Sequence, residues 1–156
     1  MPTIDEDRVF EVLDEGECRQ LLGTGGTGRL GFTEGALPAI LPVPFGLRDG
    51  DVMIPARRGS PVVTAVRGAV VVFEVGSYDG TTRTGWSVTV VGPTRLVSVP
   101  ADVAAIEALR LSPGPPAPER CYITLHVRLV RGWRMSELPA VAASARSGTS
   151  GYLPGS

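Results

Sequence analysis

The segment ALPAILPVPFGLRDGDVMIPARRGSPVVTAV, residues 36–66, decides the fold that we predict for this chain. Asp49 and Gly50 suit the positive backbone angles of a short turn between antiparallel strands. They separate two apolar runs, so the segment predicts a long strand, a hairpin and a second strand. Ser60 and Pro61 then predict a helix start, because serine caps free backbone N–H groups and proline fits the first helical position.

The predicted helix start brings together Arg57, Arg58, Gly59 and Ser60. A helix N-terminus offers unpaired N–H groups and a partial positive charge, and arginine adds a planar set of donors that fits phosphate. The alternative is a pair of arginines in an ordinary solvated loop. We favour a phosphate-binding site, because both arginines stand beside the predicted helix cap.

Length and composition predict one domain and exclude several partners. The 156 residues, 43% of them hydrophobic, fit a single domain over residues 1–139, with a flexible tail over 140–156. A formal net charge of -1 and a pI near 5.8 disfavour binding to nucleic acid or to an anionic membrane. No apolar run reaches the roughly 20 residues that span a bilayer, and the acidic first residues do not resemble a signal peptide. We therefore expect a cytoplasmic protein.

The chain offers little catalytic chemistry of its own. All fifteen basic residues are arginine, which excludes reactions that need a lysine Schiff base. His126 is the only histidine, and Cys18 and Cys121 stand in separate predicted elements, so a zinc site is disfavoured. We expect buried, reduced thiols, and we expect the protein to use the chemistry of a bound cofactor.

The rest of the chain predicts a mainly β fold. Beside the strand over 38–47 and its hairpin partner, strands are expected over 28–32, 69–75, 83–99 and 121–135, and helices over 15–22, 61–67 and 102–111. Asp14 and Asp102 are the expected helix caps. The pattern predicts a six- or seven-stranded antiparallel split β-barrel with peripheral short helices.

Three of these strands carry further detail. The strand over 69–75 is rich in valine and is expected to be buried. The strand over 83–99 is expected to bend or bulge at Gly92 and Pro93. Residues 121–135 show the clearest alternation of apolar and polar side chains in the chain, which predicts one half-buried antiparallel strand.

Prolines mark the strand over 38–47 as unusual. Pro38, Pro42 and Pro44 cannot donate backbone hydrogen bonds to a neighbouring strand. The strand is therefore either an irregular edge of the sheet or a surface whose unpaired backbone faces a planar ligand.

The order of these motifs resembles the pyridoxamine 5'-phosphate oxidase-like superfamily of FMN-binding split barrels, and in particular its branch of nitroimidazole-resistance proteins. The resemblance covers about residues 13–138 and rests on the order of short motifs, namely Gly-Arg-Leu-Gly-Phe at 28–32, Pro-Val-Pro-Phe at 42–45, the Asp-Gly hairpin, Arg-Gly-Ser at 58–60 and Gly-Trp-Ser-Val at 85–88.

The resemblance implies roles for particular residues. The cofactor-binding set would be Pro42, Val43, Pro44 and Phe45 against the isoalloxazine ring, Arg57, Arg58, Gly59 and Ser60 at the phosphate, and Trp86 and Ser87 at the ring edge. Relatives bind FMN at a homodimer interface, so His126, Arg128 and Trp133 would come from the second subunit. The residues themselves also allow plainer roles, since Trp86 could serve core or dimer packing and Ser87 could bond the backbone.

The resemblance predicts an FMN-binding oxidoreductase that reduces a small organic acceptor with NAD(P)H. Two positions differ from the family pattern: Pro61 stands where many relatives have lysine, and no histidine lies near residues 54–55. The alternatives are a deazaflavin or haem cofactor in the same fold, or a ligand-binding dimer without catalytic activity. No partner other than a second copy of the chain and a small-molecule substrate is expected.

Overall fold

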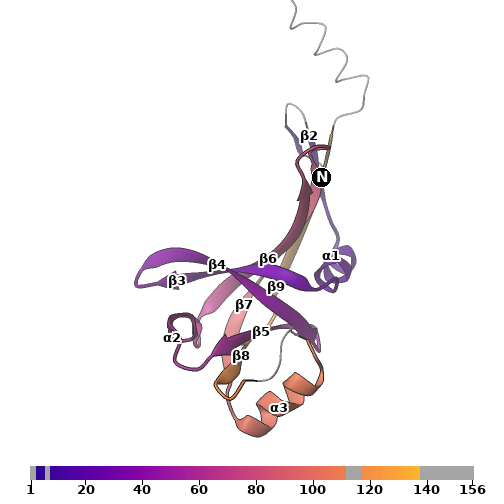
Figure 1. The fold of residues 1–156 in the computed structure, drawn as a ribbon. Coiled ribbons are helices and arrows are strands. Elements are labelled where there is room, and N and C mark those ends of the chain that lie inside the picture. The colour runs from indigo at the N-terminus through magenta and orange to yellow at the C-terminus, as the bar shows by residue number, and fades with distance from the viewer. Residues whose placement is uncertain (1–2, 6–7, 112–116, 138–156) are drawn as a thin grey trace, which may run out of the picture.

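The computed structural model describes residues 3–5, 8–111 and 117–137, and the tail expected over 140–156 lies outside these ranges. The strands are β1 (Thr3–Asp5), β2 (Arg8–Val12), β3 (Gly26–Glu34), β4 (Leu37–Arg48), β5 (Asp51–Arg57), β6 (Val70–Asp79), β7 (Thr84–Val97), β8 (Arg120–Leu125) and β9 (Leu129–Glu137). The helices are α1 (Glu15–Leu22), α2 (Pro61–Val66) and α3 (Pro100–Ala108). The three helices lie around the strands (Figure 1).

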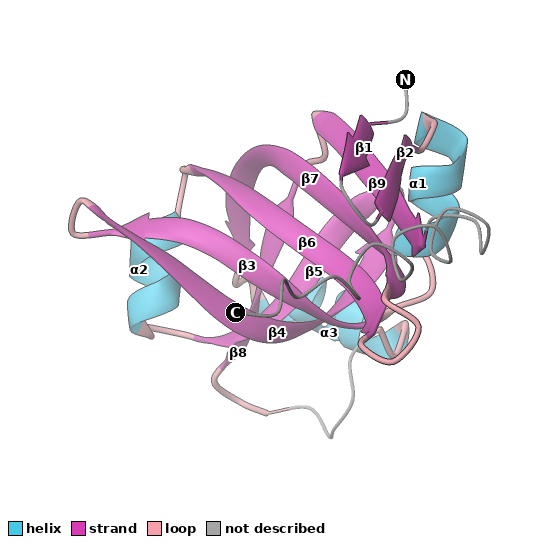
Figure 2. Cartoon of the chain, turned by 90° about the horizontal axis from the view of Figure 1, so that it is seen from above, coloured by secondary structure: helices cyan, strands magenta, loops and turns pink. Residues whose placement is uncertain are grey.

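Six strands close into a barrel. They pair in the order β7-β6-β3-β4-β5-β8, and β8 pairs again with β7. Strands β9, β2 and β1 continue the sheet outward from β7, and every pair is antiparallel. Seen from above, the strands form the centre of the molecule, with α1 and α2 at opposite sides (Figure 2). The predicted antiparallel split barrel with short peripheral helices is confirmed, with β1 and β2 as additional N-terminal strands.

Two strands change partner along their length, which is how a single sheet closes on itself. β4 pairs with β3 up to Phe45 and with β5 from Gly46 onward. β7 pairs with β6 up to Pro93 and with β8 from Thr94 onward. The bulge expected at Gly92 and Pro93 is not in β7, which keeps an unbroken register with β6; the extra residue belongs to the strand opposite, between Leu125 and Leu129.

The barrel interior is filled by side chains from every strand of the ring. Phe45 and Phe73 pack edge to face at its centre, with ring centroids 4.8 Å apart. Further buried members are Leu30, Val43, Val52, Ile54, Val71, Val75, Val88, Val90, Cys121, Ile123 and Leu125, with Leu13, Cys18 and Leu22 at α1 and Val63 and Val66 from α2. A second small cluster, Met53, Val103, Ile106 and Tyr122, buries the inner side of α3.

The last third of the chain differs from the sequence-based expectation. The single strand predicted over 121–135 is two strands, β8 and β9, because the segment 126–128 crosses over Gly92 and shifts the register along the same edge of β7 by one residue, from Thr94–Leu125 to Val91–Leu129. The predicted alternation breaks at this crossing: Leu125 is fully buried, whereas Leu129 is 43% exposed. β8 is buried on both faces, since Tyr122 packs under α3.

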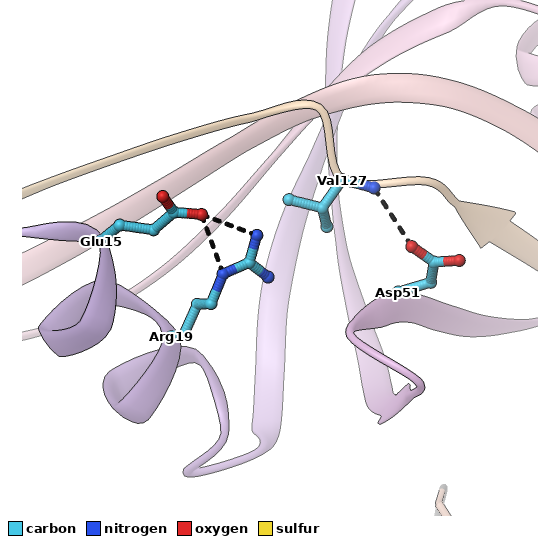
Figure 3. Close-up of polar contacts among 4 residues, drawn as sticks. All are labelled: Glu15, Arg19, Asp51 and Val127. Carbon is cyan, nitrogen blue, oxygen red and sulfur yellow. Dashed lines mark hydrogen bonds and ion pairs between the residues drawn. The ribbon is translucent and has the colours of Figure 1, made fainter.

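Asp51 holds this crossing to the hairpin of residues 49–50. Its Oδ1 accepts a hydrogen bond from the backbone N–H of Val127 at 3.3 Å (Figure 3) and lies 3.1 Å from Nδ1 of His126. The predicted turn is present, with positive φ angles of 52° at Asp49 and 82° at Gly50. Figure 3 also shows the ion pair between Arg19 and Glu15 on α1, at 2.9 Å.

All three predicted helices are present, but only one of the three expected side-chain caps is formed, since Ser60 makes no cap hydrogen bond to α2. The Asp14 carboxylate accepts from the N–H of Glu17 at 2.8 Å, as expected for α1. The expectation that Asp102 caps the third helix is wrong, because α3 begins at Pro100 with Val99 in the cap position. The strand expected to be buried over 69–75 is also only half-buried, since Val70 and Val72 face outward on β6.

Both cysteines are buried, free thiols. Burial raises the pKa of the Cys121 thiol, and it raises the pKa of the Cys18 thiol together with the nearby carboxylates of Asp14, Glu17 and Glu15. We expect neither thiol to react with an aromatic disulfide reagent at pH 8 in the folded protein, because the thiolate is the nucleophile, and both to react in denaturant. Fast reaction of either thiol without denaturant would contradict this packing.

No helix among the described residues is long and apolar enough to cross a membrane.

Candidate cofactor site

A cavity of about 850 Å³ lies on the outer face of the sheet, away from the barrel core. The alternation of β6 fixes this placement, because Phe73 and Val75 point into the barrel while Glu74, Gly76 and Tyr78 line the cavity. The walls are Phe10 and Val12 of β2, Thr27, Gly28 and Arg29 of β3, Pro42 of β4, Glu74, Gly76, Ser77 and Tyr78 of β6, Gly85, Trp86 and Ser87 of β7, and Trp133 and Met135 of β9.

Two glycines leave the centre of the cavity open. Gly76 lies opposite Ser87, and Gly85 lies opposite Tyr78, in the β6–β7 ladder. A Cβ on Gly76 would stand 2.7 Å from the carbonyl oxygen of Trp86, and a Cβ on Gly85 would stand 2.5 Å from that of Ser77. Close packing of the two backbones therefore requires glycine at both positions, and the missing side chains leave space on the sheet.

Several aromatic residues line the walls. Phe10, Tyr78 and Trp133 come from three different strands, and the pairing of Ser87 with Trp133 sets this tryptophan beside the polar centre of the cavity. Trp86 also borders the cavity, but it alternates with Ser87 along β7 and packs against the barrel core. Large, mostly apolar cavities with a few convergent polar groups are typical of small-molecule and cofactor sites. The arrangement suits a planar ring system that can lie against aromatic side chains.

The polar centre of the cavity is a network of Arg29, Glu74 and Ser87 from three neighbouring strands. Nε of Arg29 donates to Oε1 of Glu74 at 2.9 Å, and Nη2 of Arg29 contacts the same oxygen. The hydroxyl of Ser87 donates to Oε2 of Glu74 at 3.0 Å. Arg29 and Glu74 are direct partners in the β3–β6 ladder, so the sheet register itself brings them together.

Arg29 and Glu74 were missed as site residues by the sequence analysis. A signal was present, because Glu74 is the only charged residue in the run from Val70 to Val75. A carboxylate in an otherwise apolar strand needs either solvent or a partner, and here it has both Arg29 and Ser87.

The residues predicted from the sequence to bind a cofactor ring fall into two groups. Pro42, Trp86 and Ser87 line the cavity, and so does Trp133 of the late strand, in the same chain. Val43 and Phe45 point into the barrel and are only 6% and 2% exposed. Pro44 is half-buried and is not among the residues that line the cavity.

The predicted phosphate site, residues 57–60, lies apart from the cavity, since none of its four residues lines it. Arg57 is exposed, and Nη2 of Arg58 donates to the carbonyl of Ser98. Gly59 has a positive φ of 74°, which favours glycine there. Ser60 occupies the cap position of α2 without a side-chain cap bond, and its buried Oγ has no hydrogen-bond partner among the described residues.

Among the described residues, the Ser60 hydroxyl and the Arg57 guanidinium have no hydrogen-bond partner. The start of α2 and the exposed guanidinium of Arg57 are groups of the kind that bind phosphate, and the assignment of this segment to a phosphate stays a prediction. His126 and Arg128, which the resemblance assigns to the second subunit, do not line the cavity either. The described residues contain no group of three or more His, Cys, Asp or Glu side chains suited to hold a metal ion.

Comparisons with known proteins agree with this fold. The sequence model of the family described as pyridoxamine 5'-phosphate oxidase matches residues 14–143, and the chain belongs to this family. The uncharacterised protein Rv0080 of Mycobacterium tuberculosis is 42% identical over 102 residues, which make up 62% of this chain and 67% of that protein.

Solved structures that are similar include the following two. The FAD binding protein from Mycobacterium smegmatis is 26% identical with a TM-score of 0.70, over 83% of this chain and all of that one. A 5-nitroimidazole antibiotic resistance protein from Bacteroides thetaiotaomicron has a TM-score of 0.70 over 88% of this chain and 92% of that one. At 10% identity, this second similarity concerns the fold alone.

Proposed function

We propose that this protein binds a flavin nucleotide and acts as a flavin-dependent oxidoreductase on a small organic molecule, with NAD(P)H as the electron donor. The observation that carries the proposal is the 850 Å³ cavity, whose aromatic walls surround the polar network of Arg29, Glu74 and Ser87. Membership of the pyridoxamine 5'-phosphate oxidase family and the similarity to an FAD binding protein support it.

The flavin would supply hydride or single-electron transfer, and the chain's residues would bind and orient it. Trp133 and Tyr78 offer apolar surface to a planar ring, and Ser87 and Arg29 offer polar contacts to its edge. The described walls carry neither histidine nor cysteine, and Tyr78 and Met135 are the residues there of a type that can hold haem iron. We propose a flavin rather than haem because of the polar network and the family.

We further propose that two chains share each flavin. The ring would bind in the cavity of one subunit and the phosphate at residues 57–60 of the other, since these two parts lie apart within one chain. An exposed apolar patch beside the cavity supports an interface there. Ile40 and Val72 both flank Gly31 on the cavity face of the sheet, and Ile40 is 73% exposed.

Absorption spectra of the purified protein titrated with FMN and with FAD test the proposal. We expect visible flavin bands with at least one of the two nucleotides and a Kd below tens of micromolar, which corresponds to roughly 6 to 7 kcal/mol of binding. FMN was the nucleotide expected from the sequence, and the Mycobacterium smegmatis relative makes FAD an equal candidate. Absence of bound flavin with both nucleotides would overturn the proposed function, and a deazaflavin would then be tested.

A variant of one aromatic wall residue locates the ring. Replacing Trp133 by alanine removes a stacking surface, and we expect the flavin Kd to rise about tenfold while the melting temperature changes little, because Trp133 is partly exposed. Leu109→Ala, at the exposed C-cap of α3, is the matched control and should bind as the wild type does. An unchanged Kd in Trp133→Ala would place the ring elsewhere.

A further inference from the structure

The polar network in the cavity has a fixed direction of hydrogen bonding. A carboxylate has no proton to give, so the hydrogen of the Ser87 hydroxyl goes to Oε2 of Glu74. With its hydrogen engaged, Ser87 Oγ can form further hydrogen bonds only through its lone pairs, as an acceptor. Ser87 can therefore accept a hydrogen bond from a ligand in the cavity, but it cannot donate one while Glu74 holds its proton.

Arg29, beside Ser87, supplies hydrogen-bond donors instead of an acceptor. Its Nε and Nη2 are engaged by Oε1 of Glu74, whereas none of the hydrogen bonds between described residues uses its Nη1. The Arg29 side chain is 62% exposed and lines the same cavity. Glu74 thus stands between a hydroxyl that only accepts and a guanidinium that only donates, and it fixes both.

We propose that Glu74 is a positioning residue that makes Ser87 a hydrogen-bond acceptor for a ring N–H. Ser87 and Arg29 together then recognise the edge of a heterocycle on which an N–H donor stands next to a carbonyl acceptor. This inference rests on the proposed function and names the part of the flavin that the site recognises. In the oxidised isoalloxazine ring the single ring N–H is at N3, between two carbonyl groups. The pair therefore matches the pyrimidine edge of the ring.

The same chemistry predicts what the site rejects. A site built to hydrogen-bond a donor discriminates strongly against an analogue that lacks it, because its own polar groups are then left unpaired. A flavin methylated at N3 has no ring N–H in the oxidised state. FMN, FAD and deazaflavin share the pyrimidine edge, so the network does not distinguish among them.

Glu74→Gln tests the network without removing its shape. Arg29 donates two N–H groups toward the Oε1 position, so the carbonyl oxygen of glutamine belongs there and its NH₂ group faces Ser87. The glutamine then donates to Ser87, and the serine hydrogen turns toward the cavity. The substitution is expected to convert Ser87 from an acceptor to a donor.

The experiment measures the Kd of FMN and of N3-methyl-FMN for the wild type, Glu74→Gln and Ser87→Ala by quenching of flavin fluorescence, with FAD and N3-methyl-FAD as the second pair. We expect the wild type to bind the unmethylated flavin roughly tenfold more tightly or better. Both variants should lose most of this preference through weaker binding of the unmethylated flavin. Glu15→Gln, which breaks an ion pair on α1 outside the cavity, should keep it.

Each outcome has one meaning. A methyl group that is merely too large would leave the affinity of the unmethylated flavin unchanged in Glu74→Gln, since this variant makes no extra room, and that result would overturn the inference. Equal binding of both flavins by the wild type would also overturn it, while leaving the proposed function intact. A wild type that binds no flavin would reject the proposed function and the inference with it.

Discussion

Replacing Gly92 by alanine is expected to destabilise the protein by about 3 to 5 kcal/mol or to prevent folding. A Cβ at this position would stand 1.7 Å from the backbone oxygen of His126, which is far inside van der Waals contact. The crossing segment cannot move away, because backbone hydrogen bonds of 2.9 Å hold it on both sides, from His126 to Pro93 and from Arg128 to Val91. Relief of the clash would break these hydrogen bonds, which hold the segment 126–128 to β7.

Urea unfolding of Gly92→Ala and of the matched variant Gly80→Ala measures this effect. Gly80 lies between β6 and β7 and has no positive φ, and a Cβ there would meet no atom within 4 Å beyond its chain neighbours. Alanine at this position should therefore change the unfolding free energy by less than about 0.5 kcal/mol. A Gly92→Ala protein with a wild-type midpoint would show that the crossing does not pass over this residue as described.

The fold was predictable where local signals and tertiary structure agree. The Asp49-Gly50 turn, the cap of α1 by Asp14 and the long strands on either side each follow from short-range chemistry, and the structure has all of them. The crossing at 126–128 was not predictable from periodicity. Its cause is a contact with Gly92, more than thirty residues earlier, and both strands that it separates carry β-forming residues.

The site followed the same rule. Ser87 and Trp86 were found because they stand in a recognisable motif, and both line the cavity. Arg29 and Glu74 were missed because only the β3–β6 register makes them partners, and register is a property of the folded sheet. Val43 and Phe45 belong to β4, the strand expected to contact the cofactor. Side chains alternate between the two faces of a strand, however, and these two point into the barrel, where they form part of the core.

Two variants are each expected to lose flavin binding as homodimers. Flavin binding is expected to return when one chain of each variant is combined in a mixed dimer. Arg57→Ala/Arg58→Ala removes the cationic donors at residues 57–60, and loss of charge-assisted bonds to a phosphate should weaken binding by roughly 100-fold or more. Ser87→Trp fills the open centre of the cavity opposite Gly76, and we expect a similar loss. Both changes lie on exposed or half-buried positions, so the melting temperatures should stay close to that of the wild type.

The mixed dimer, purified through two different affinity tags, decides whether the flavin is shared. If the ring binds in one subunit and the phosphate at residues 57–60 of the other, one of the two sites combines the intact cavity of the arginine variant with the intact arginines of the Ser87→Trp chain. Such a dimer should bind about one flavin with wild-type affinity. If ring and phosphate are instead bound by the same chain, every site carries one defect and the mixed dimer stays empty. The intermediate stoichiometry therefore arises only from a site that two chains complete together.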